Sequence, residues 1–147
     1  MLKLSQRDSR WSFEKIGKTN ITVGRMGCTI TCLAMLSSYF GCYKTPGMLA
    51  KYLSYTKDAL LIWSSIPSEL CFSLHKRFYG YNAELIAEGL KLKNTAVILQ
   101  VQGYHWVVAI SKIPLTKTYI IADPWTGKLS TTLAYKNQIT GGAVLIK

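Results

Sequence analysis

The sequence has few acidic residues and few histidines, and it contains no long apolar run. Seven Asp and Glu residues stand against eighteen Lys and Arg residues, which gives a formal net charge of +11. The first residues run straight into polar side chains without the apolar core of a secretion signal, and no apolar stretch is long enough to span a bilayer. We therefore expect a protein synthesised in soluble form without a signal peptide, acting in the cytoplasm, with a virus particle or after release by lysis.

The excess of positive charge predicts attraction to anionic polymers such as nucleic acid, a cell wall or a lipid surface. Basic residues are scattered from Lys3 to Lys147 and never form a long run. No zinc-finger, recognition-helix or aromatic RNA-binding pattern accompanies them. An anionic surface is therefore an expected partner, whereas nucleic acid is a disfavoured one.

The length of 147 residues is that of one ordinary domain, and nothing in the chain looks like a linker or a repeat. Hydrophobic residues make up 49% of the chain, which is a globular composition without disordered segments. We expect a single domain over residues 1–147 that folds without a cofactor and exists as a monomer.

The four cysteines, Cys28, Cys32, Cys42 and Cys71, could form two disulfides in three ways. A chain without a secretion signal is expected to keep its cysteines reduced, so the sequence predicts free thiols. Cys28 and Cys32 have the i, i+4 spacing of two metal ligands on a helix. No closely spaced Cys or His pair supplies the other ligands, and no metal site is predicted.

Hydrophobic periodicity predicts helices in the first half of the chain and strands in the second. The expected helices cover about 28–40, 45–55, 67–79 and 83–90, and the expected strands cover 95–101, 105–111, 118–122, 130–135 and 143–146. The first helix is apolar on nearly every side, which indicates a position in the middle of the domain. This segregation is typical of an α+β fold with an antiparallel sheet.

A cysteine begins the most apolar helix, and a histidine begins an apolar strand. Cys28 follows Gly27 at the helix start, where unpaired N–H groups and the helix dipole stabilise a thiolate. His105 is the candidate base, because the other histidine, His75, stands among basic residues and is interpreted as a surface residue. A thiolate beside an imidazole is the arrangement of a thiol-dependent hydrolase. The alternatives are a small buried apolar cysteine and a structural histidine.

Asp123 is the candidate partner of His105. The strands 105–112 and 117–123 are joined by a short turn around Pro114. A hairpin folded at this turn pairs positions whose numbers sum to 228, so His105 would face Asp123 with Cβ atoms about 5 Å apart. The carboxylate would then orient the imidazole. The alternative is that Asp123, which precedes a proline, is an ordinary turn former.

Gln6 is a candidate oxyanion donor, because a side-chain amide commonly assists the backbone N–H of a nucleophilic cysteine. The alternative is a solvated residue near the N-terminus. Tryptophans and a tyrosine near the candidate triad are expected to line the cleft rather than react. The candidate substrate-binding residues are Gly27, Tyr104, Trp106 and Trp125.

Taken together, these segments resemble the papain-like cysteine peptidases that process the double-glycine leader peptides of bacteriocins, and more closely the stand-alone relatives of that family. The resemblance covers nearly the whole chain. It rests on residues 6–11, 24–35, 105–108 and 123–127. Relatives commonly carry a Gly-Pro-Thr type run after the cysteine, whereas this chain has Thr-Ile-Thr-Cys over 29–32. That departure concerns the fit of the substrate more than the reaction.

The resemblance implies Cys28 as nucleophile, His105 as base and later acid, Asp123 as the residue that orients it, and Gln6 as oxyanion donor. It also implies a papain-like fold with a helical half packed on an antiparallel sheet and a cleft between them. We therefore expect a cysteine peptidase that hydrolyses a peptide bond through an acyl-enzyme. The alternatives are a cell-wall amidase or endopeptidase acting on wall peptides, and a non-catalytic module that binds peptide or glycan.

Overall fold

The structure, a computed structural model, describes all residues from 1 to 147. The helices are α1 (Val23–Met26), α2 (Cys28–Phe40), α3 (Pro46–Tyr52) and α4 (Ala83–Lys91), with 3-10 helices η1 (Trp63–Ser68) and η2 (Thr132–Tyr135). The strands are β1 (Ser73–Tyr79), β2 (Thr95–Val101), β3 (His105–Lys112), β4 (Tyr119–Asp123), β5 (Lys128–Thr131) and β6 (Ile139–Ile146). None of these helices has the length and apolar character that crossing a bilayer would need.

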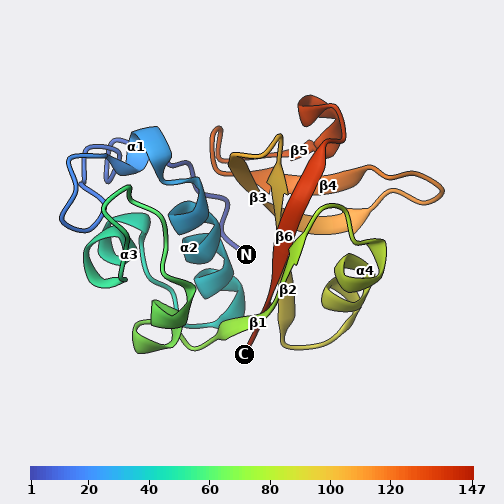
Figure 1. Ribbon diagram of the computed structural model, residues 1–147, viewed down its shortest axis with the longest axis horizontal. Helices are drawn as coiled ribbons and strands as arrows, with labels where there is room; N and C mark the ends of the chain where they lie inside the picture. The colour runs from blue at the N-terminus through green and yellow to red at the C-terminus, as the bar shows by residue number, and fades with distance from the viewer.

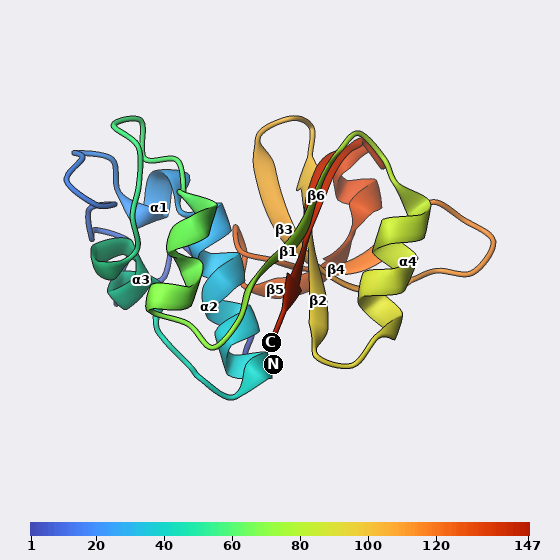
Figure 2. The same cartoon turned by 60° about the horizontal axis from the view of Figure 1, so that its bottom comes forward.

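The six strands form one sheet in the order β1-β6-β2-β3-β4-β5, and every neighbouring pair is antiparallel. Helices α1, α2 and α3 lie on one side of the sheet and α4 lies on the other (Figure 1). The turned view shows the same three layers, with the two chain termini close together (Figure 2). This is the expected α+β architecture, with a helical half against an antiparallel sheet.

Two apolar cores hold these layers together. The larger core lies between the helical half and the sheet, and nine of the thirteen residues of α2 are buried in the structure. The smaller core joins α4 to the sheet. In β2, Ile98 belongs to the larger core, whereas Val97 and Leu99 belong to the smaller one. Because both faces of this central strand are covered, β2 is apolar at every position from Ala96 to Leu99 instead of alternating.

The predicted helix over 67–79 is wrong, because this segment holds the end of η1 and the edge strand β1. The expected apolar stripe included Leu74 and Phe78, and an i, i+4 spacing fits one face of a strand as well as a helix. A β-bulge between Leu74 and Lys76 then turns the two residues to opposite cores. His75 is exposed, as expected, but it lies on a strand.

Most other boundaries are close to the prediction, although β6 begins at Ile139, four residues before the expected start of that strand. Helix α2 ends at Gly41, whose left-handed φ of 84° suits a residue without a side chain. The Thr45 side chain caps α3 by accepting the N–H of Met48 at 3.1 Å, and the helix ends three residues earlier than expected. The predicted strand over 130–135 is wrong over its last four residues, where η2 follows β5.

The prediction that all four cysteines are free is also wrong. Cys42 and Cys71 form a disulfide across a sequence separation of 29, and only Cys28 and Cys32 remain as thiols. The bond ties the end of α2 to the segment that enters β1. The Cα atoms of the pair lie 6.1 Å apart, a closeness that only the tertiary fold produces.

Candidate active site

Cys28 is the first residue of α2, directly after the short helix α1. Gly27 lies between the two helices, and a Cβ there would stand only 2.4 Å from the carbonyl oxygen of Val23. The junction is therefore tight enough to require glycine. No side chain caps the N-terminus of α2. The positive end of the helix dipole therefore lies beside the partly exposed Cys28 thiol without a capping group.

The second free thiol is in a different environment. Cys32 lies one helical turn after Cys28 and is completely buried in the larger core. Burial, with a smaller effect of Cys28 nearby, raises the pKa of the Cys32 thiol well above its ordinary value. Of the two free thiols, only Cys28 is therefore placed for chemistry.

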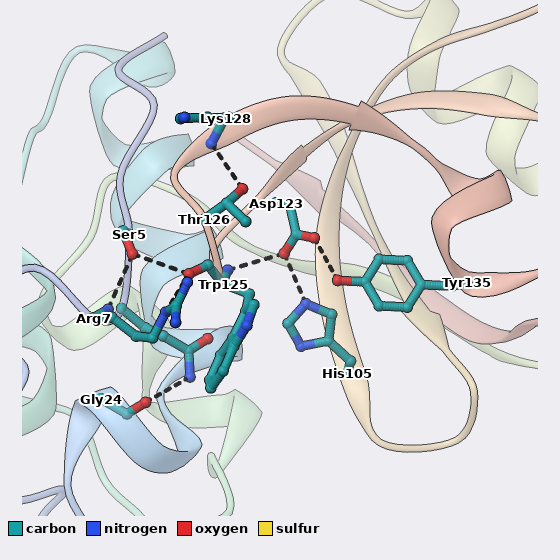
Figure 3. A network of polar contacts seen from close by, with 10 residues as sticks. Ser5, Arg7, Gly24, His105, Asp123, Trp125, Thr126, Lys128 and Tyr135 are labelled. Carbon is teal, nitrogen blue, oxygen red and sulfur yellow. Dashed lines mark hydrogen bonds and ion pairs between the residues drawn. The ribbon is translucent and has the colours of Figure 1, made fainter.

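His105 and Asp123 are in contact, as the sequence predicts. The Nε2 atom of His105 lies 2.9 Å from Oδ1 of Asp123, and both residues are buried (Figure 3). The predicted register is nevertheless wrong: Val108 pairs with Ala122, so the pairs nearest the site sum to 230 rather than 228, and the pairs beyond a bulge after Ala109 sum to 231. Because this error is two residues, both side chains stay on the expected face, and they meet diagonally.

Two further donors hold the Asp123 carboxylate. The backbone N–H of Trp125 donates to Oδ1 at 2.9 Å, and the hydroxyl of Tyr135 donates to Oδ2 (Figure 3). Burial raises the pKa of Asp123, but hydrogen bonds from His105, Tyr135 and the Trp125 N–H outweigh it and leave the pKa below its usual range. Asp123 is therefore a fixed carboxylate at neutral pH.

Tyr135 is a site residue that sequence reasoning missed. It lies in η2, and its ring centroid is 5.2 Å from that of His105. The sequence places it in a predicted strand twelve residues after Asp123, with no local signal that the chain turns back at this point. Tyr135 thus touches two members of the predicted triad.

The electrostatics favour a protonated His105. Burial lowers the pKa of this imidazole, but the Asp123 carboxylate and the Cys28 thiol raise it, and the pKa is about 9. The Cys28 thiol is therefore close enough to act on the imidazole. At neutral pH the structure favours an imidazolium between a carboxylate and a thiol.

Gln6 is buried and held from two directions. Its backbone N–H donates to the Pro124 carbonyl at 2.7 Å, and its Nε2 donates to the Gly24 carbonyl at 3.2 Å. Its Oε1 is buried without a hydrogen-bond partner. The N-terminal segment thus joins the turn after β4 to helix α1, beside Cys28.

The same segment is fixed to Trp125. The carbonyl of Trp125 accepts hydrogen bonds from Ser5 Oγ at 3.2 Å and Arg7 Nε at 2.8 Å (Figure 3). The Arg7 guanidinium lies 4.3 Å from the centre of the Trp125 ring. Gly127 has a φ of 72°, and a Cβ there would approach Ser5 to 3.1 Å, so this contact also depends on glycine.

A cavity of about 410 Å³ collects most of the predicted residues. Its lining includes Gln6, Cys28, Tyr104, His105 and Trp125, and the residues that the sequence did not single out are Arg25, Met26 and Tyr135. Arg25 and Met26 immediately precede the Gly-Cys pair. Their closeness to Cys28 in the sequence could have identified them as lining residues. Asp123 does not line the cavity.

A second, smaller cavity of about 70 Å³ also borders Cys28. It is mostly apolar, and Trp106 lines it together with Leu60 and Leu61. The predicted substrate-binding residues therefore separate: Tyr104 borders both cavities, Trp125 the larger and Trp106 the smaller. Gly27 is buried and lines neither of them.

The geometry defines a thiol and an imidazole that meet at a cleft between a helical half and a sheet. A sequence profile of the Peptidase C39 family matches residues 19–139, which is most of the chain. The chain belongs to this family and is a cysteine peptidase.

One solved structure has the same fold. It is the N-terminal peptidase C39 like domain of the toxin secretion ATP-binding protein from Vibrio parahaemolyticus, with a TM-score of 0.59 and 18% sequence identity. The alignment covers 82% of this chain and 96% of that one. A comparison with curated proteins gives no significant match.

Proposed function

We propose that this peptidase hydrolyses a peptide bond with Cys28 as nucleophile, His105 as general base and acid, Asp123 as the orienting carboxylate and Gln6 as an oxyanion donor. One observation carries the proposal: a partly exposed thiol at an uncapped helix N-terminus shares a cavity with an imidazole whose pKa is about 9. This combination supports a reactive thiolate beside an imidazolium.

In the proposed reaction, the Cys28 thiolate attacks the carbonyl carbon of the scissile bond and forms a C–S bond. The His105 imidazolium gives its proton to the leaving nitrogen as the C–N bond breaks, and an acyl-enzyme remains. Neutral His105 then takes a proton from water, whose oxygen attacks the thioester carbon. The C–S bond breaks, the acid product leaves, and the thiolate–imidazolium pair is restored.

The negative oxygen that forms in each step needs donors. An amide nitrogen carries two hydrogens, and Gln6 Nε2 uses one of them on the Gly24 carbonyl. The other is available to the cavity that Gln6 lines together with Cys28. We assign the second donor to the backbone N–H of Cys28, at the positive end of α2.

Asp123 and Tyr135 are positioning residues in this scheme. Asp123 binds Nε2 of His105, which leaves Nδ1 for Cys28, and Figure 3 shows this second ring nitrogen directed away from Asp123. Tyr135 fixes the other carboxylate oxygen and packs against the imidazole. These contacts fix the orientation of the ring. They also keep the Nε2 proton on the side of Asp123 when the imidazole is neutral.

Brief alkylation with iodoacetamide at about pH 6, mapped by mass spectrometry, tests the pair. An ordinary thiol is almost entirely protonated at that pH, so rapid labelling requires a stabilised thiolate. We expect modification of Cys28 alone, with buried Cys32 unmodified. The His105→Ala variant should lose the rapid labelling, whereas the matched control His75→Ala, which replaces an exposed histidine on β1, should keep it. Slow labelling that is equal in all three proteins would exclude the thiolate–imidazolium pair.

The protonation of His105 gives a second prediction that needs no substrate. An NMR titration of the His105 ring should have its midpoint near pH 9, and Asp123→Asn should move the midpoint to lower pH because the carboxylate raises it. The His75→Ala variant assigns the signal. A midpoint near 6.5, the ordinary value, would contradict the proposed ion pair.

The same raised pKa fixes the sign of the pH dependence of stability. The folded state binds the proton more tightly, so this stabilisation is complete below about pH 6.5 and is lost as the pH rises through 9. The free energy of unfolding should therefore decline over this interval in the wild type, and the contribution should be absent from His105→Ala.

A further inference from the structure

A second concave site lies on the helical half, away from the triad. It is a cavity of about 590 Å³ between the loop before α1 and the segment after α3. Three lysines line it, Lys18, Lys51 and Lys57, and all three are exposed. Three of the eighteen Lys and Arg residues of the chain thus surround one hollow, and the peptide-cleaving chemistry does not explain them.

No carboxylate neutralises these lysines. The cavity lining contains no Asp or Glu, and none of the three lysines forms an ion pair. The acids nearest to them in the sequence, Glu14 and Asp58, are exposed and line no part of this cavity, although Glu14 and Lys51 both line a neighbouring one. Three ammonium groups without an ion-pair partner around a hollow create a positive potential that attracts an anion.

Polar groups at the same site are ready to donate. The hydroxyl oxygen of Thr56 accepts the N–H groups of Asp58 at 3.3 Å and Leu60 at 3.2 Å. Its own hydrogen is therefore free for an acceptor in the cavity that Thr56 lines. A ligand with several negative oxygens would find both charge and hydrogen bonds.

This lysine cavity adjoins the smaller cavity beside Cys28. Tyr55 lines both of them. The residue is fixed, because its hydroxyl donates to the Leu49 carbonyl at 2.7 Å and its backbone forms a β-bridge with Leu61. A chain that passed over Tyr55 would therefore follow a path from the three lysines over an apolar surface to the thiol.

We propose that the substrate is a peptide with an acidic segment, which binds in the lysine cavity while an apolar side chain next to that segment enters the small cavity beside Cys28. This inference rests on the proposed function, because it takes Cys28 as the point of cleavage. The charge of the lysine cavity selects the acidic segment, and the lining of Leu60, Leu61 and Trp106 selects the apolar side chain.

A peptide fits this path better than a nucleic acid. Binding of single strands relies on exposed aromatic rings for stacking with bases. Tyr55 is the only aromatic residue of the lysine cavity, and its ring packs under Gly17, where a Cβ would be 3.1 Å from the ring. A polymer that also reaches the nucleophile of a peptidase is a peptide.

The test measures binding of fluorescein-labelled hexaglutamate by anisotropy, at about 50 mM salt so that electrostatic binding is not screened away. The variant Lys18→Gln/Lys51→Gln/Lys57→Gln should bind at least tenfold more weakly than the wild type. The matched control, Lys91→Gln/Lys93→Gln/Lys112→Gln, removes three exposed lysines elsewhere and has the same net charge. It should bind within twofold of the wild type.

Three results would overturn the inference. The first is absence of hexaglutamate binding by the wild type. The second is equal weakening in the two triple variants, which would show an effect of net charge alone. The third is that inorganic polyphosphate or oligothymidylate binds more tightly than hexaglutamate and that the lysine-cavity variant loses this binding. That result would identify a phosphate polymer as the occupant.

The outcome is separable from that of the proposed triad, because equilibrium binding does not need a reactive Cys28. If Cys28 fails to label but hexaglutamate binds in the lysine cavity, the triad is wrong and the anionic site remains. For peptides that the protein cleaves, the lysine-cavity variant should raise KM for acidic sequences and leave kcat unchanged.

Discussion

Replacement of Cys28 by serine is expected to lower kcat/KM for peptide cleavage by roughly a thousandfold or more, with the melting temperature nearly unchanged. The hydroxyl of serine fills almost the same space at the start of α2, but it is a far weaker nucleophile at neutral pH. The measurement is the rate of product formation from a cleavable peptide, together with thermal unfolding of both proteins.

His105→Ala should lower kcat/KM to a similar extent, but its stability should also fall. The imidazole is buried and bonded to Asp123, so its removal leaves a buried carboxylate oxygen with fewer donors, at a cost of roughly 1–3 kcal/mol. The double variant of Cys28 and His105 should be no slower than either single one, because the two residues act as a unit. Retention of wild-type turnover by Cys28→Ser would rule out the proposed chemistry.

Tyr135→Phe is expected to have a smaller effect on catalysis than the replacements of Cys28 and His105. The variant keeps the ring beside His105 and removes only the hydroxyl that holds Asp123. Loss of one charge-assisted hydrogen bond predicts a fall in kcat/KM of about tenfold, expressed in kcat rather than KM. A raised KM with an unchanged kcat would contradict this positioning role and indicate lost substrate binding instead.

Loss of the disulfide is the second large expected effect. Replacing both Cys42 and Cys71 by alanine should lower the free energy of unfolding by roughly 3–4 kcal/mol, because the closed loop restricts the unfolded chain. The sequence separation of 29 residues sets this magnitude. In a protein of this size the melting temperature should fall by about 10 °C.

The measurement is denaturant unfolding of the wild type and the double variant, each with and without dithiothreitol. The reductant should destabilise the wild type to the level of the variant and should leave the variant unaffected. Because the loop between the two cysteines contains Tyr55, Leu60 and Leu61, peptide affinity should decrease along with stability. A wild type whose unfolding midpoint is insensitive to reductant would contradict the prediction.

Much of the fold follows from local patterns. Helix α2 and strand β2 were predictable because the hydrophobic pattern of each segment fits a single type of secondary structure over its whole length. The contact between His105 and Asp123 was predictable despite a wrong register, because the faces of a strand repeat every two residues. These features depend on neighbours in sequence or on a single hairpin.

The missed features depend on contacts between distant segments. Strand β1 pairs with β6, some seventy positions along the chain, and its i, i+4 spacing alone cannot separate strand from helix. The Cys42–Cys71 bond requires the end of α2 to meet the approach to β1. Tyr135 reaches Asp123 only because η2 turns the chain back after β5. No local spacing encodes these approaches.

The position of Gln6 has a practical consequence for any shortened form of the protein. The family profile begins at residue 19, whereas Gln6 and the core residue Trp11 precede it. A protein that began at the start of the profile would retain cysteine, histidine and aspartate, yet it would lack the amide that we assign to the oxyanion and the N-terminal segment that secures the turn after β4. We therefore expect proteolytic cleavage within this segment to abolish activity while every member of the proposed triad remains in place.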